Sequence, residues 1–342
     1  MSEANLLKPL QIGNVTTRNN LILSPMSGVT DSAFRRTVLR ASGPSVGLLV
    51  SEFIAAEGLS RDNPKTRAML RYLECERPIS IQIFGADVDR MVRAAIMVEE
   101  AGADILDINC GCPAPKVVRR GGGAQLMRTP EQLRDIIRGI RAAISLPVTV
   151  KIRAGWDDAH RNAIDIAHMV EDEGAAMLAV HPRTRLQLYS GTPDWDLIGE
   201  IHRRLKIPVA GSGDIVDPQR ALDRISGGYC DAVMIGRGAI DEPWIFAQID
   251  ALDRGAPVPQ ATADDRAALL NYFRRALEET REERSYLGRL RGLAYRMAKG
   301  VPGGSAARRA LSDARTASDI EGIFRDFVLD GRRFEDRLAH VA

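Results

Sequence analysis

Cys112 is the residue whose type and setting most strongly indicate chemistry. It lies near the start of a glycine-rich segment, residues 107–127 (DINCGCPAPKVVRRGGGAQLM), and a proline follows it. A thiol has a pKa of about 8.5, so it is mainly protonated at neutral pH and can act as a general acid. A cysteine can also simply pack in a core, and this interpretation suits Cys110, which lies within the preceding apolar run. The C-x-C spacing lacks the second pair of ligands that a metal site needs, so no metal is predicted.

Three polar side chains end other apolar runs of the chain. Lys151 closes VTVK, and because an unpaired buried ammonium is costly, this lysine indicates an anion nearby or one that forms during a reaction. Gln82 can donate and accept hydrogen bonds, which suits the edge of an amide-like ring. His181 is a neutral donor or acceptor near pH 7. Each also has a structural interpretation: an amine that reaches solvent, a capped strand end and a satisfied structural histidine.

Two short glycine-containing segments predict a site for a phosphate group. They are GSGDI at residues 211–215 and IGRG at residues 235–238. Glycine lets a ligand approach the backbone closely, and Arg237 can add a bidentate contact to an anion. Neither segment is a dinucleotide-binding fingerprint, and two tight turns are the alternative.

The elements that must position these residues are short, β-rich apolar runs. Eight such runs begin 24 to 43 residues apart, enough for a strand, a covering helix and two loops. They are nearly continuous rather than alternating, which indicates burial on both faces. The runs begin at Leu21, Leu48, Ile79, Ile105, Val148, Ala175, Pro208 and Ala232. We therefore predict a (β/α)₈ barrel, with helices over 88–103 and 129–144, the second capped by Thr129; an open, doubly wound sheet is the alternative.

The βα pattern stops near residue 253, and a linker with two prolines precedes a helical stretch. This predicts a catalytic barrel over residues 1–253 and a small all-α domain over residues 254–342. No run of about 18 apolar residues is present, which excludes a spanning helix, and the N-terminus lacks the features of a secretory signal. Four cysteines at this length do not form a disulfide framework, so we expect a cytoplasmic protein. The net charge of +2 says nothing about nucleic acid.

Several motifs, in order, resemble those of the tRNA-dihydrouridine synthases, and the nearest subgroup is the bacterial B-type enzymes. The resemblance runs from about residue 10 to 250, and the combination is specific although no single motif is. The motifs are SPMSGVTDSAFR at 24–35, IQIFG at 81–85, DINCGCPAPKV at 107–117, VTVKIRAGW at 148–156, HPRTRLQLYSG at 181–191, GSGDI at 211–215 and DAVMIGRGAIDEPWIF at 231–246.

The resemblance implies an FMN-binding barrel followed by a helical domain that binds tRNA. It implies that NADPH reduces the flavin, that a hydride passes to carbon 6 of a uracil, and that Cys112, in the family's N-x-G-C-P motif, protonates carbon 5. It assigns flavin contacts to Pro25, Met26, Ser27, Gln82, Lys151, His181, Ser212, Gly213, Asp214, Gly236 and Arg237, and substrate contacts to Asn109 and Arg183. From the sequence as a whole we expect no membrane association, no metal and no obligate protein partner.

The tail carries a stretch that is basic and free of acidic residues between 284 and 312, which suits RNA phosphates. We expect Arg291, Arg296 and Lys299 to contact the substrate. The family's B-type members often have Arg-Lys-His followed by Trp-Tyr, whereas this chain has RGLAYRMAKG at 291–300. Two alternative functions remain at this point: a flavin barrel that reduces a small molecule, and an RNA-binding scaffold without catalysis.

Overall fold

Eight parallel strands close into a barrel in the computed structural model of the chain, which describes residues 5–298 and 304–339, with side chains of the last helix up to residue 328. The strands are β3 (Leu21–Leu23), β4 (Leu48–Val50), β6 (Ile79–Phe84), β7 (Ile105–Cys110), β8 (Val148–Arg153), β9 (Met177–His181), β10 (Val209–Gly211) and β11 (Ala232–Ile235). Parallel pairing of β11 with β3 closes the ring, and a two-residue strand, β5 (Ile54–Ala55), lies beside β6. The predicted barrel is confirmed, and the open sheet is excluded.

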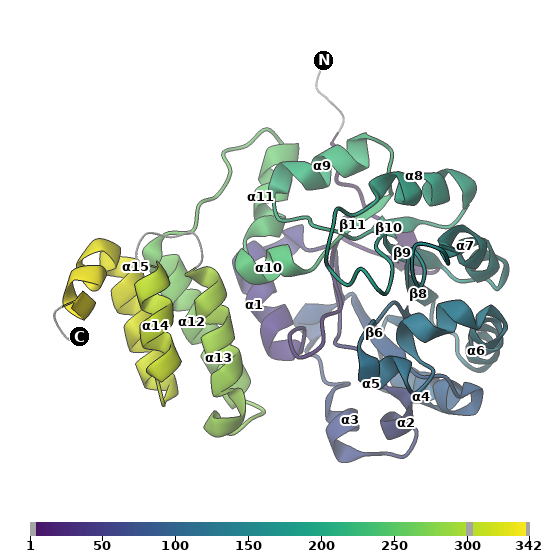
Figure 1. The fold of residues 1–342 in the computed structure, drawn as a ribbon, viewed down its shortest axis with the longest axis horizontal. Helices are drawn as coiled ribbons and strands as arrows, with labels where there is room; N and C mark the ends of the chain where they lie inside the picture. Colours follow the sequence, from purple (N-terminus) through teal and green to yellow (C-terminus); the bar gives the residue numbers. More distant parts are fainter. Residues whose placement is uncertain (1–4, 299–303, 340–342) are drawn as a thin grey trace.

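Helices cover the outside of the barrel (Figure 1). They are α1 (Ser32–Ser42), α2 (Ala56–Leu59), α3 (Pro64–Ala68), α4 (Val88–Glu100), α5 (Pro115–Val118), α6 (Pro130–Ala143), α7 (Ala163–Asp172), α8 (Trp195–Arg204), α9 (Pro218–Ser226), α10 (Arg237–Asp241) and α11 (Ile245–Asp253). The two helices expected from the sequence are present as α4 and α6. Thr129 does precede α6, but its hydroxyl donates to the side chain of Gln132 (3.1 Å) instead of capping a backbone N–H.

The N-terminal end of the barrel is closed by a hairpin that sequence analysis missed. Its strands, β1 (Gln11–Ile12) and β2 (Val15–Thr16), are too short to show a pattern. Leu10 and Ile12 pack against inward-facing side chains of the strands, such as Ile22 and Met234. Because side chains fill this end and the interior, only the opposite, C-terminal mouth is available for a site.

In the described part of the chain after the barrel, four helices pack beside it, next to α1 and α10 (Figure 1). They are α12 (Ala263–Glu278), α13 (Glu283–Met297), α14 (Gly304–Asp313) and α15 (Ala317–Ala339). Thr262 and Asp265 form a reciprocal capping box at the start of α12, which explains why the helix begins directly after the linker. The predicted helical tail is therefore present.

The barrel and the tail share buried apolar contacts and ion pairs. Phe34 of α1 meets Phe273 of α12 edge to face, with ring centroids 6.3 Å apart. Arg36 of α1 forms an ion pair with Glu279 (2.7 Å), directly after α12. The apolar faces of α1 and α12 belong to one continuous core cluster, so the tail is packed onto the barrel along α1.

Candidate active site

A cavity of about 570 Å³ opens at the C-terminal mouth of the barrel. Its walls come from the ends of seven strands and from the loops that follow them. Twelve of the residues singled out from the sequence line it together: Pro25, Met26, Ser27, Asn109, Cys112, Lys151, His181, Ser212, Gly213, Asp214, Gly236 and Arg237. Residues up to 212 positions apart in the chain thus meet in one cavity, because parallel strands end at the same rim.

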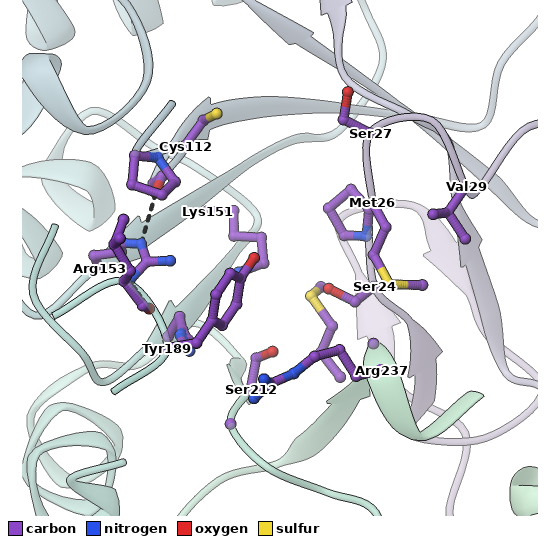
Figure 2. A pocket seen from close by; sticks show the side chains of 18 of the residues that line it. Ser24, Met26, Ser27, Val29, Cys112, Lys151, Arg153, Tyr189, Ser212 and Arg237 are labelled. Atoms are coloured by element: carbon purple, nitrogen blue, oxygen red, sulfur yellow. Dashed lines mark hydrogen bonds between the residues drawn. The ribbon is translucent and has the colours of Figure 1, made fainter. Parts of the chain in front are cut away.

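Cys112 lies at one side of the cavity, across from Met26 and Ser27 (Figure 2). Its side chain is 9% exposed, and burial is the main reason that the pKa of its thiol is raised. The backbone N–H of Ala114 and the charge of Arg153 act in the opposite direction and stabilise the thiolate. At neutral pH the thiol is therefore protonated. After the proton leaves, the Ala114 N–H and Arg153 stabilise the thiolate.

Lys151 and His181 are two titratable side chains on the floor of the cavity. Burial, followed by the positive charge of Arg153, lowers the pKa of Lys151 to about 8, while the charge of Asp107 acts in the opposite direction. Burial also holds the pKa of His181 well below its ordinary value, followed by repulsion from Lys151 and neighbouring arginines. Lys151 is thus mainly charged and His181 neutral at pH 7, and His181 Nδ1 is buried without a hydrogen-bond partner among the described residues.

The loops after β9, β10 and β11 are joined by one carboxylate. Arg183, almost fully buried, donates to both oxygens of Asp214 at 3.0 and 2.6 Å, and Arg237 donates to Oδ1 at 2.5 Å. The hydrogen bond from Arg183 is the main reason that the pKa of Asp214 is lowered. Arg183 does not line the cavity but supports its wall from behind, and its expected contact with substrate stays a prediction.

Gln82 was expected to contact the flavin ring, yet its side chain is fully buried and is not part of the cavity wall. Its amide bonds Asp107 and Asn109 below the floor. Gln82 is also not the last residue of its strand, because β6 continues two residues beyond it to Phe84. Contact of Gln82 with the flavin stays a prediction.

The three tail residues expected at the substrate lie away from this cavity or outside the described residues. Arg291 donates to the backbone oxygen of Ala314 (2.6 Å), within the tail. Arg296 forms an ion pair with Asp241 of α10 (3.0 Å). Lys299 lies outside the described residues. Contacts of these side chains with RNA stay a prediction.

Two cavity residues, Arg153 and Tyr189, were given no role from the sequence. Arg153 donates to the backbone oxygens of Gly111 (2.8 Å) and Leu188 (2.9 Å), so it ties the Cys112 segment to the loop after β9. The ring of Tyr189 is 57% exposed and lies between the guanidinium groups of Arg153 and Arg237, 5.8 and 4.6 Å from its centroid (Figure 2). The sequence did hold a signal for Tyr189: it lies in a loop with two other apolar residues, Leu186 and Leu188, close to the end of a predicted strand.

Within residues 5–298 and 304–339, no three His, Cys, Asp or Glu side chains are arranged to hold a metal ion. Across that same part of the chain, no helix is both long and apolar enough to cross a membrane.

A closed parallel barrel whose strand ends surround a thiol, a half-buried lysine and paired arginines defines an enzyme of the (β/α)₈ class. Solved structures agree on the fold. A variant of NCR from Zymomonas mobilis matches with a TM-score of 0.54 and 20% identity, covering 77% of this chain and 95% of that one. Morphinone reductase in complex with tetrahydroNAD also gives 0.54, at 16% identity over 77% and 94%.

The sequence comparisons are more specific. The family described as "Dihydrouridine synthase (Dus)" matches residues 22–328. The chain is 42% identical over 266 residues to "tRNA-dihydrouridine synthase B" of Shewanella oneidensis, covering 77% of this chain and 82% of the relative. It is 37% identical over 334 residues to "Probable tRNA-dihydrouridine synthase" of Mycobacterium tuberculosis, covering 94% and 86%. The chain belongs to the dihydrouridine synthase family of flavin-dependent oxidoreductases.

Proposed function

We propose that this protein reduces uridine in tRNA to 5,6-dihydrouridine, with FMN as cofactor and NADPH as the electron donor. The observation that carries the proposal is that one cavity is lined by a thiol, Cys112, whose pKa is raised by burial, and by a half-buried amine, Lys151. This chain matches relatives over most of their length that are described as tRNA-dihydrouridine synthases, which supports tRNA as the substrate.

The cavity residues fit a flat, phosphate-bearing cofactor. A Cβ atom on Gly236 would lie 3.5 Å from Met26 Sδ, so the absence of a side chain there keeps the space along Met26 open. Ser212 and Arg237 supply a hydroxyl and a guanidinium on the same wall for a phosphate, and the unpartnered His181 Nδ1 offers a further polar contact. Pro25, Met26 and Lys151 would border the ring. When bound, FMN supplies two-electron chemistry, accepting hydride equivalents from NADPH and delivering one to carbon 6 of the uracil.

Cys112 completes the reduction by giving the proton on Sγ to carbon 5. The uracil double bond then gains one hydride and one proton, and a thiolate remains. Burial keeps the proton on the sulfur until it is needed, because it raises the pKa of the thiol. The Ala114 N–H and Arg153 stabilise the thiolate, and solvent water returns the proton before the next turnover.

Lys151 holds positive charge beneath the reacting groups. A fixed ammonium in a cavity that excludes most water stabilises negative charge on whatever is bound above it. Arg153 fixes the Cys112 segment through Gly111, so the acid is presented in one position.

The mouth of the cavity suits a base that has left its stack. Leu188, Tyr189 and Val216 line the cavity and are each about half exposed or more, which is unusual for apolar side chains with no partner covering them. Aromatic and apolar faces of this kind hold flipped bases and offset part of the cost of unstacking.

The test is direct. The purified protein is incubated with NADPH and a tRNA transcript that lacks dihydrouridine, and the RNA is digested and analysed by mass spectrometry. We expect a uridine to gain two hydrogen atoms, only when NADPH is present. A yellow protein that leaves the RNA unchanged but reduces a small enone or a dihydroorotate-type ring would move the assignment to a small-molecule reductase. A colourless protein that binds tRNA without changing it would indicate a scaffold.

A further inference from the structure

A continuous line of buried polar side chains runs under the cavity floor to the backbone of Cys112. Thr149 Oγ1 donates to Asp107 Oδ1 (2.5 Å), and Gln82 Nε2 donates to Asp107 Oδ2 (2.5 Å). Asn109 Nδ2 donates to Gln82 Oε1 (2.8 Å). Asn109 Oδ1 then accepts from the backbone N–H groups of Gly111 (3.2 Å) and Cys112 (2.9 Å). We call Thr149, Asp107, Gln82 and Asn109 the relay.

The donor and acceptor at each link are determined from both ends of the relay. At one end, backbone N–H groups can only donate, so the Asn109 atom that faces them is the oxygen, and its NH₂ group faces Gln82. At the other end, an oxygen of Asp107 accepts, so the NH₂ group of Gln82 faces it. Both arguments give the same orientation for both amides, which are otherwise free to flip by half a turn.

The relay is buried on all sides. Gln82 is 0%, Thr149 1%, Asp107 3% and Asn109 6% exposed, so water does not replace a lost partner at the deeper links. A carboxyl group in such a place is costly without partners, and Lys151 is the cation of the described residues that acts on it. Of the four, only Asn109 lines the cavity, beside Cys112.

We propose that Gln82 and Asp107 are positioning residues for Cys112: through Asn109 they hold the turn that carries the thiol in place over the substrate. This inference rests on the proposed function, in which Cys112 is the proton donor. It gives Gln82 a role beneath the cavity, where its amide bonds Asp107 and Asn109. The relay spans three neighbouring strands, β6, β7 and β8, so it connects the position of the thiol to the rigid barrel wall.

The test compares two variants that change the same corner of the core. Gln82→Met keeps the length of the side chain but deletes both of its hydrogen bonds. The double variant D107N/Q82E keeps every link: the new amide at 107 accepts from Thr149 and donates to the new carboxylate at 82, which also accepts from Asn109. The double variant also keeps the net charge of the wild type. If these side chains acted only through their shape, D107N/Q82E would be more impaired than Gln82→Met. The relay predicts that D107N/Q82E is the less impaired of the two.

Two measurements are made on each holoprotein. The first is the rate at which iodoacetamide alkylates Cys112, followed by peptide mass spectrometry so that the exposed Cys75 is counted separately. For Q82M we expect this rate to change about tenfold, the equivalent of about one hydrogen bond. The second is turnover on tRNA: we expect kcat to fall about 10- to 100-fold, as for a misplaced catalytic group, with KM nearly unchanged. D107N/Q82E should restore both values to within a few-fold of the wild type.

Ser80→Ala is the matched control. Ser80 lies on the same strand as Gln82, is 1% exposed, and its hydroxyl has no hydrogen-bond partner among the described residues, so we expect both measurements to stay near wild type. If Q82M does not fold, recovery of folded protein in D107N/Q82E is the expected result, and a double variant that also fails to fold overturns the proposal. It is likewise overturned if D107N/Q82E is no better than Q82M, if S80A is as impaired as Q82M, or if Q82M loses flavin while Cys112 alkylation is unchanged.

The two proposals fail in different ways. If the wild-type protein leaves tRNA unreduced, the proposed function is wrong, and the alkylation rates still report on the relay. If the wild-type protein reduces tRNA and the order of the variants is not the predicted one, only the relay is wrong.

Discussion

Two cysteines that lie two positions apart have opposite surroundings. Cys110 is the last residue of β7 and has no exposed surface, and burial raises the pKa of its thiol well above the ordinary value. Cys112 lies just beyond the strand, lines the cavity, and has two groups that stabilise its thiolate. Only the second can give up a proton to a bound substrate and recover it from solvent.

Cys112→Ala should therefore keep its flavin and lose turnover by about 10²- to 10⁴-fold, the usual contribution of a positioned acid. Flavin content is read from the visible spectrum and turnover from dihydrouridine formation. Cys110→Ala is the matched control: it removes a thiol of the core, should cost about 1 kcal/mol of stability, and should leave turnover intact. Full turnover in the Cys112 variant would mean that another group supplies the proton.

Lys151 should titrate near pH 8 in the cofactor-free protein, against 10.5 for an ordinary lysine. Burial favours the neutral amine, so the folded chain binds this proton more weakly than the unfolded chain. Between about pH 8 and 10.5, Lys151 consequently makes folding more favourable as the pH rises. The pH dependence of reductive methylation at Lys151, followed by mass spectrometry, measures the midpoint.

Variants of the two charged neighbours test whether each neighbour shifts the pKa of Lys151 in the expected direction. Arg153→Met removes a repelling charge and should raise the pKa, while Asp107→Asn removes an attracting charge and should lower it. A midpoint at the ordinary lysine value in the wild-type protein would contradict the prediction.

At the scale of elements, α13 is tied to the loop that follows β3. Arg289 of α13 forms an ion pair with Asp31 and donates to the backbone oxygen of Val29 (2.8 Å). Asp31 also caps α1 by accepting from the N–H of Phe34 (3.1 Å), and Val29 lines the cavity. One guanidinium therefore links the tail, the first barrel helix and the wall of the site.

Arg289→Met should lower the free energy of unfolding by about 1–3 kcal/mol, because it leaves a largely buried carboxylate and a carbonyl without this partner. Arg281→Met is the matched comparison. Arg281 binds the same carboxylate at 3.1 Å but is 35% exposed, so its loss should cost under about 1 kcal/mol. Urea denaturation of both variants gives the two values, and equal losses would contradict the proposed importance of the tie.

At the scale of the whole molecule, the barrel and the tail depend on one core. Phe273 of α12 is 2% exposed and packs on Phe34 of α1, and both belong to the cluster that continues into the barrel. A helical tail that shares its core with the barrel should unfold with it. The domain boundary at residue 253 is thus predicted to separate two functions rather than two independently stable units.

Phe273→Ala should cost about 3–5 kcal/mol and leave a single unfolding transition. Leu73→Ala, at a side chain that is 47% exposed on the barrel surface, should change stability by under about 0.5 kcal/mol. Calorimetry with denaturant titration checks both, and two separate transitions in the wild-type protein would show that the tail folds independently.

The sequence by itself determined the architecture and most of the cavity wall. Strands buried on both faces need continuous apolar runs, and parallel strands must end at one rim, so the residues after each run were bound to meet. This argument predicted Cys112, Lys151 and Asp214 at the cavity without any knowledge of distances. It works because each step depends on a residue and its immediate neighbours in the chain.

Only the tertiary structure decided which polar groups face the cavity and which support it from behind. Gln82 and Arg183 follow the same local pattern as Lys151 and His181, yet Gln82 bonds Asp107 below the floor and Arg183 holds Asp214. Arg289 reaches a carboxylate 258 positions away. Burial and partners of this kind depend on how separate elements pack, and no local periodicity encodes the direction in which a side chain points or the partner that it meets.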